Sequence, residues 1–65
     1  MLEPTVRWDI EVRRPGKEWG WIETRDDPEE AKQLVLDTRA FSKQHRIQEE
    51  CRAVRHECSH TVEPW

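Results

Sequence analysis

The stretch that most constrains this chain is "TVRWDIEVR", Thr5 to Arg13, in which apolar and charged residues alternate without a break. A period of two is typical of a β-strand that buries one face and exposes the other. A two-stranded sheet is marginal in water, so the rest of the chain must supply another strand and a layer over the apolar face. The side chains expected on that apolar face are Val6, Trp8, Ile10 and Val12.

The next residues, "RPGK", predict a turn that reverses the chain. Pro15 sets φ for the second position of a type II turn, and Gly16 accepts the positive φ of the third position. A slightly longer loop with a bulge also fits a hairpin. We expect the return strand over Glu18–Thr24, "EWGWIET".

Two registers of this hairpin remain open. In the first, Val12 faces Trp19 and Ile10 faces Trp21 on the apolar side. A slip by one residue moves both tryptophans to the opposite face. The register therefore decides whether these indoles fill the core or form a surface.

The segment "DDPEEAKQLV" predicts the start of a helix. Asp27 fits the N-cap, Pro28 fits the first helical position, and Glu30 completes a capping-box pattern. Apolar residues then recur at helical spacing. The expected core stripe is Ala31, Leu34, Val35, Thr38 and Phe41.

Residues 45–60 fit either a helix or a strand, and we favour a strand because it extends a marginal hairpin. The predicted fold is α+β, a single small ββαβ domain over residues 1–65: an antiparallel hairpin, one helix packed on the sheet and a final strand. The alternative is a hairpin followed by two helices. Residues 61–65, "TVEPW", are expected to form a frayed tail.

The run "VRWDIEVRRPGKEWGWIETRDDPEEAKQL" followed by "CRAVRHE" resembles short uncharacterised ββαβ-type proteins of actinobacteria and their phages. The resemblance covers most of the chain. It implies a fold plan and a phage or mobile-element origin, and it implies no activity.

The segment "ECRAVRHECSH" holds both cysteines, but its spacing does not predict a bridge or a complete metal site. Cys51 and Cys58 would lie ~23 Å apart along a strand or ~10 Å apart along a helix, beyond the ~7 Å that a disulfide spans. Along one strand, His56 and His60 would lie ~13 Å apart, and on a helix they would be one turn apart. Either geometry supplies two ligands, so His56, Cys58 and His60 are weak metal candidates, and a small zinc-stabilised domain is an alternative.

The tryptophans are the most informative feature for function. Four tryptophans in 65 residues are many for a chain that is only 34% hydrophobic. Tryptophan and arginine dominate the energetic centres of protein interfaces, although these indoles could instead fill a lean core. We expect a small protein-interaction module that binds a partner protein through a sheet edge and an exposed surface, with a homodimer as one option. The candidate partner-binding residues are Arg13, Arg14, Lys17, Trp19, Trp21 and Trp65.

Charge and composition bound the other classes of function. The net charge of −3 disfavours nucleic-acid binding, which draws most of its affinity from phosphate neutralisation. A nucleic-acid-associated module remains the main alternative. No catalytic constellation or phosphate loop is evident, so we expect no enzyme and no cofactor. No apolar run is long enough to span a membrane, and we expect a cytoplasmic protein. The basic residues of the nucleic-acid alternative are Arg7, Arg13, Arg14, Lys17, Arg52 and Arg55.

Overall fold

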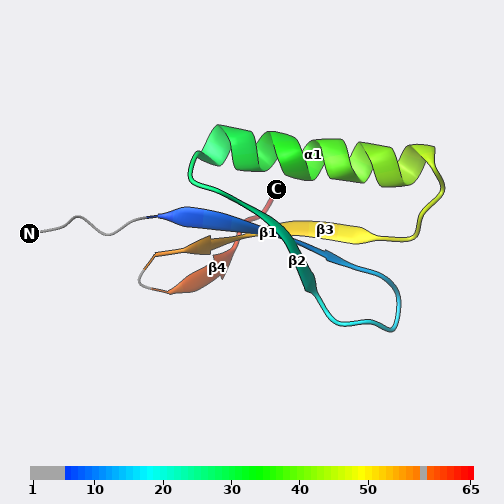
Figure 1. The fold of residues 1–65 in the computed structure, drawn as a ribbon, viewed down its shortest axis with the longest axis horizontal. Coiled ribbons are helices and arrows are strands. Elements are labelled where there is room, and N and C mark those ends of the chain that lie inside the picture. Colours follow the sequence, from blue (N-terminus) through cyan, green and yellow to red (C-terminus); the bar gives the residue numbers. More distant parts are fainter. Residues whose placement is uncertain (1–5, 58) are drawn as a thin grey trace, which may run out of the picture.

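The computed structural model describes residues 6–57 and 59–65. Within these ranges, four strands form one antiparallel sheet in the order β2-β1-β3-β4, and one helix lies across one face (Figure 1). The predicted α+β architecture, with a strand rather than a second helix after α1, is confirmed. The sequence did not predict β4. The elements are β1 (Arg7–Arg13), β2 (Gly20–Arg25), α1 (Pro28–Gln44), β3 (Glu50–His56) and β4 (His60–Val62).

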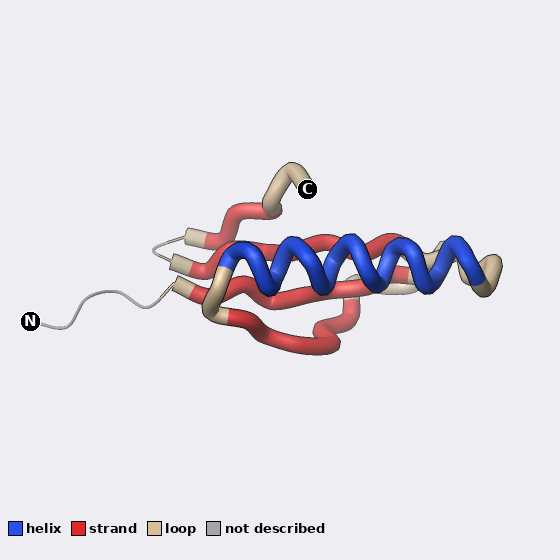
Figure 2. The backbone as a smooth tube through the Cα atoms, turned by 90° about the horizontal axis from the view of Figure 1, so that it is seen from above, coloured by secondary structure: helices blue, strands red, loops and turns tan. Residues whose placement is uncertain are grey.

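The two central strands of the sheet, β1 and β3, come from distant parts of the sequence. Both β2 and β3 run antiparallel to β1, so they are parallel to each other with β1 inserted between them. The helix α1 connects these two strands and lies along the sheet when seen from above (Figure 2). It is not long and apolar enough to cross a membrane, and no other helix occurs among the described residues.

The turn after β1 has the predicted type II geometry. The Lys17 amide donates to the Arg14 carbonyl oxygen at 3.0 Å, and Gly16 has a φ of 76°. A side chain at position 16 would be strained at this φ, which explains the glycine. The return strand begins at Gly20, two residues later than expected.

Of the two registers left open, the hairpin takes the slipped one, and Val12 does not pair with Trp19 nor Ile10 with Trp21. Val12 instead pairs with Gly20, and Glu11 pairs with Trp21. A bulge then inserts Ile22, so that Ile10 pairs with Glu23. The bulge lets Trp21 lie on the face away from α1 while Ile10 keeps its place beneath the helix.

The helix begins as predicted. The Asp27 side chain accepts a hydrogen bond from the Glu29 amide at 2.9 Å, and Pro28 occupies the first turn. The predicted stripe is wrong at Phe41, which is 55% exposed. Ala31 and Val35 are buried as predicted, and Ser42 is buried in place of Phe41, because a rotation of about 100° per residue returns position 42, rather than 41, to the sheet.

The core lies between α1 and the β1–β3 pair. Ile10 and Val35 are its largest fully buried side chains. Trp8 closes one end of the core, and its indole Nε1 donates to Glu63 Oε1 at 3.1 Å. The remaining buried members are Ala31, Cys51 and Ala53, with Val6, Val12, Leu34 and Trp65 packed against them.

The last residues, expected as a frayed tail, lie against β3 and α1 in the structure. The Glu63 amide continues the ladder by donating to the Ala53 carbonyl oxygen at 2.9 Å. The chain then turns toward α1, where the Arg39 guanidinium donates to the carbonyl oxygens of Trp65 at 2.6 Å and Cys51 at 2.9 Å. Arg39 thereby occupies a carbonyl at the edge of β3 that β4 leaves unpaired.

Candidate functional site

The face of the sheet opposite α1, here called the open face, carries the exposed tryptophan and a network of paired charges. Strand alternation and the observed registers place alternate residues of each strand on this face. Its side chains are Arg7, Asp9, Glu11, Arg13, Trp19, Trp21, Thr24, Glu50, Arg52, Val54, His56, His60 and Val62.

The two tryptophans of the hairpin have different environments on the open face. The Trp21 side chain is 62% exposed, and its indole Nε1 donates to Thr24 Oγ1 at 2.9 Å. The Trp19 ring is half-buried against two guanidinium groups, with Cζ of Arg52 at 4.0 Å and Cζ of Arg13 at 4.8 Å from the ring centroid. Cation–π contacts hold the Trp19 ring in place, whereas Trp21 presents most of its indole to solvent.

The charged residues of the open face form opposite-charge pairs between β1 and β3. Arg13 Nη2 lies 2.8 Å from Glu50 Oε2, and Arg52 Nε lies 2.8 Å from Glu11 Oε1. Including Arg7, which lies 3.8 Å from an oxygen of Asp9, three arginines face three acids. The open face therefore carries no formal excess charge from these six residues.

A second polar cluster connects β2, β1, β3 and β4 across the open face. Thr24 Oγ1 donates to Asp9 Oδ1 at 2.8 Å, and the other oxygen, Asp9 Oδ2, lies 2.9 Å from His56 Nε2. The His56 ring lies against the His60 ring, with centroids 3.9 Å apart. The pairing of His56 with His60 across two strands corrects the ~13 Å expected along one continuous strand, because the chain turns between them.

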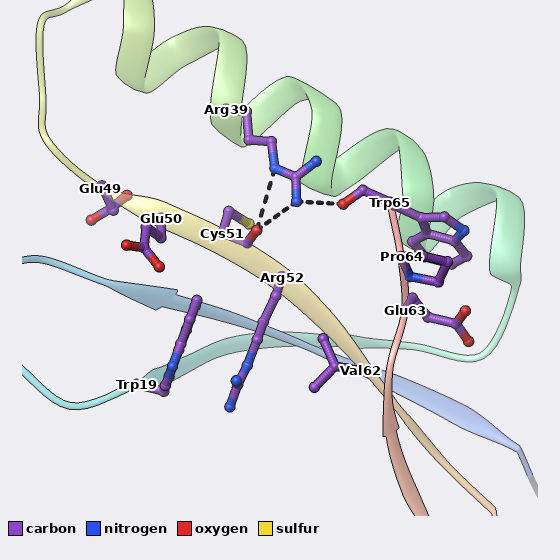
Figure 3. Close-up of a pocket in the computed structure, with 10 residues that line it drawn as sticks. All are labelled: Trp19, Arg39, Glu49, Glu50, Cys51, Arg52, Val62, Glu63, Pro64 and Trp65. Carbon is purple, nitrogen blue, oxygen red and sulfur yellow. Dashed lines mark hydrogen bonds between the residues drawn. The ribbon is translucent and has the colours of Figure 1, made fainter.

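A shallow groove of about 560 Å³ follows the edge of β3 beyond the end of its pairing with β4 (Figure 3). Trp19, Arg52 and Val62 reach it from the open face, while Arg39 and Trp65 border it on the helix side. Its charged groups are all engaged: Arg39 with two carbonyls, and the others in ion pairs. The acids that line it are Glu49, Glu50 and Glu63.

The structure brings only part of the predicted partner-binding set together. Arg13, Trp19 and Trp21 share the open face. Arg14 and Lys17 lie in the exposed turn after β1, and Arg14 Nε is 3.6 Å from Glu49. Trp65 is half-buried and packs against the core on the helix side, apart from the open face, and its role in partner binding stays a prediction.

The six basic residues of the nucleic-acid alternative do not form one patch. Arg7 and Arg52 lie on the open face with their acidic partners. Arg55 pairs across from Trp8 on the helix side, where its Nε lies 3.8 Å from Glu63. Phosphate contacts by these residues would require their ion pairs to open.

Cys51 is the only cysteine among the residues that the structure describes. Cys51 is buried beneath α1, and burial raises the pKa of its thiol above the ordinary value of 9.0, while the nearby Arg39 and a hydrogen bond with Thr38 lower it. A raised pKa and burial make a thiol a poor nucleophile. Cys58 lies outside the described residues. No group of three or more potential ligands occurs among residues 6–57 and 59–65.

Sequence reasoning missed the acids and the threonine of the open face. Asp9, Glu11 and Thr24 have ordinary positions in an alternating pattern, and their cross-strand partners are 15 to 47 residues away along the chain. The available signal was the charge pattern of the two strands, since both β1 and β3 carry acids and arginines at alternate positions of one face, Glu11 and Arg13 on β1 and Glu50 and Arg52 on β3. That signal becomes useful only when the β1–β3 register is known.

Comparisons of this chain with protein-family models, with curated proteins and with solved structures find no significant match.

Proposed function

We propose that this domain is a non-enzymatic protein-interaction module that binds a partner protein through the open face, with Trp21 as its anchor. The observation that carries the proposal is a tryptophan that is 62% exposed on a sheet face that no element of residues 6–57 and 59–65 covers. A small domain rarely leaves this much indole in solvent without a partner. Tryptophan is also the residue most enriched at the energetic centres of interfaces.

The surroundings of Trp21 support recognition of a protein. The neighbouring Trp19 is held between β2 and the arginines of β1 and β3, which makes a rigid contact surface with little entropy left to lose on binding. Val62, 51% exposed on β4, adds a second apolar contact across the face. The balanced charges allow approach of either an unrelated protein or a second copy of this chain.

The alternatives receive less support from this geometry. Nucleic-acid binding favours unpaired cationic groups, whereas Arg13 and Arg52 are paired with acids. The groove along β3 is shallow, and its acids are held in ion pairs with arginines that do not line it, which is unlike a catalytic cleft. The phage or mobile-element origin and the cytoplasmic location are proposed from the sequence alone.

The test compares two single variants that remove equally exposed aromatic side chains from opposite sides of the molecule. Trp21→Ala removes the proposed anchor, and Phe41→Ala removes a 55% exposed ring on α1. Wild type and both variants are immobilised on a support and exposed to cell lysate, and the bound proteins are identified by mass spectrometry. Light scattering of each purified chain measures self-association. We expect Trp21→Ala to weaken binding by about 30-fold or more, the effect of losing ~2 kcal/mol at an interface centre.

The matched control decides the interpretation. Phe41→Ala should bind like wild type, because its side chain lies on the opposite side of the sheet. The proposal is wrong if the wild-type chain is monomeric at all concentrations and every captured protein is retained equally by Trp21→Ala. Steep loss of binding with salt, together with recovery of nucleic acid, would instead favour the nucleic-acid alternative.

A further inference from the structure

The imidazoles of His56 and His60 are arranged as a cross-strand pair at the end of the β3–β4 hairpin. The Glu63 amide bonds to Ala53, so the antiparallel alternation makes His56 and His60 a non-hydrogen-bonded pair. Side chains approach each other most closely at such pairs. The observed ring centroids, 3.9 Å apart and tilted by 49°, agree with this geometry.

The spacing of these rings suits chelation of one transition-metal ion. Zn²⁺ binds imidazole nitrogens at ~2.0–2.1 Å, which places two nitrogens on one ion about 3 Å apart. With the centroids 3.9 Å apart, rotation of the exposed His60 ring about its side-chain bonds can meet this separation while His56 stays in place. Both histidines also lie on the open face, so an ion can reach them from solvent, and His60 is exposed.

Asp9 supplies the outer carboxylate that metal-binding histidines commonly use. Its Oδ2 lies 2.9 Å from His56 Nε2, which favours a proton on Nε2 and leaves the lone pair on Nδ1. The Asp9 carboxylate is itself held by the Thr24 hydroxyl at 2.8 Å. The His56 side chain is only 18% exposed, so its ring is oriented before any ion arrives.

We propose that His56 and His60 form a two-imidazole binding site for a divalent transition-metal ion such as Zn²⁺, with Asp9 as a positioning residue. Water completes the coordination, since no group of three or more potential ligands occurs among the described residues. The site goes beyond the interaction function proposed above and does not depend on it. Bound metal would join β3 to β4 and fix the open edge of the sheet.

The experiment titrates zinc chloride into the full-length chain at neutral pH with a non-chelating reductant, and calorimetry measures affinity and stoichiometry. We expect saturable binding of one Zn²⁺ per chain. Asp9→Asn should weaken it by ~10–100-fold, the usual cost of losing an outer carboxylate, and His60→Ala should weaken it by more. His45→Ala is the matched control, because His45 stacks on Phe41 at the end of α1 and should leave the affinity unchanged.

Two spectroscopic measurements separate metal ligation from general stability. NMR of the imidazole protons should show Zn²⁺ shifting the resonances of His56 and His60 but not those of His45. The imidazole ¹⁵N shifts of His56 should report a changed tautomer population in Asp9→Asn, which a purely structural role of Asp9 would not require.

Three outcomes overturn the proposal. They are the absence of zinc binding, unchanged affinity in His60→Ala, and loss of binding in Cys58→Ser with retention in His60→Ala. Trp21→Ala should keep its zinc affinity, so this site and the proposed interaction surface can fail independently.

Discussion

The two faces of the β1–β3 pair are held together by different forces. On the face beneath α1, Ile10 pairs with Ala53 and both are almost completely buried. On the open face, the same two strands are joined by opposite charges, Arg13 with Glu50 and Glu11 with Arg52. Burial of apolar area supplies most of the free energy of folding, whereas exposed ion pairs contribute ~0–1 kcal/mol each.

The open face instead specifies the register of the central strands. A slip of β3 by two residues would keep the same side chains beneath α1, so apolar burial discriminates weakly against it. In one direction, the slip would place Glu11 opposite Glu50, and in the other it would place Arg13 opposite Arg52. Either slip brings like charges together across the sheet, which is destabilising. The face beneath α1, here called the covered face, stabilises the fold, whereas the open face selects one register of β1 and β3.

The largest expected effect is on the covered face. Ile10→Ala removes a fully buried side chain from a domain with a lean core and should lower the free energy of unfolding by ~2–5 kcal/mol. Urea denaturation followed by circular dichroism measures the loss. Ile10→Val, which keeps most of the volume, should cost ~0.5–1.5 kcal/mol. Equal losses for both variants would contradict the assignment of Ile10 to the core.

A smaller effect is expected from the hydrogen bonds by which Arg39 of α1 holds β3 and the C-terminal residues. Arg39→Met keeps the apolar stem but leaves the Cys51 and Trp65 carbonyls without their donor. We expect a loss of ~1–3 kcal/mol in unfolding free energy. Lys43→Met on the exposed part of α1 is the control and should change it little. A stability equal to wild type would mean that water replaces the guanidinium fully.

A still smaller effect on stability is expected from exchanging the charges of Arg13 and Glu50, which tests whether the open face sets the register of β1 and β3. The double variant Arg13→Glu with Glu50→Arg keeps the native pair but removes the like-charge contact from both slipped registers. Unfolding free energy should change by less than ~1 kcal/mol, while amide NMR spectra should show a second set of signals for β3. Arg13→Glu alone, which creates a like-charge native pair, should cost more stability than the double variant. A single set of signals in the double variant would show that burial alone fixes the register.

The smallest effect concerns Cys51 and appears only in alkali. Burial raises the thiol pKa in the folded state, so the unfolded chain loses this proton at lower pH than the folded chain. Stability from this group is therefore complete below pH 9.0 and declines as pH rises from there toward the folded pKa. Denaturation of the Cys58→Ser chain across alkaline pH, compared with the same chain carrying Cys51→Ala, isolates the slope. An identical slope in both chains would contradict it.

Local rules account for the parts of the fold that the sequence predicted. The alternation of β1, the Pro15–Gly16 turn and the Asp27 cap each depend on neighbours within a few residues. The position of Trp21 depends instead on a loop that delays β2 to Gly20 and on the bulge at Ile22. A glycine within a strand can signal a bulge, but Gly20 alone does not reveal on which residue it falls.

The candidate site was less predictable than the fold, because its contacts are made between strands that are distant in sequence. Asp9 meets His56 only after the register of β1 and β3 is set. His60 joins them through β4, a strand of only three residues that pairs with β3 after the chain turns. The prediction that Phe41 is buried was wrong for a simpler reason. The stripe was chosen from apolar residues alone, and this choice ignored Ser42, whose small side chain faces the sheet.

The placement of β1 beside β3 also has a consequence for synthesis of the chain. The nearest pair of the two strands, Arg13 with Glu50, is separated by 37 residues, so the central pairing requires closure of a long loop. Until β3 has been translated, the β1–β2 hairpin and α1 lack the β3 part of their core, and Ile10 is without the Ala53 side of its packing. Non-local pairing of this kind slows folding, so a nascent or truncated chain that stops before β3 would expose its apolar strand to chaperones and proteases.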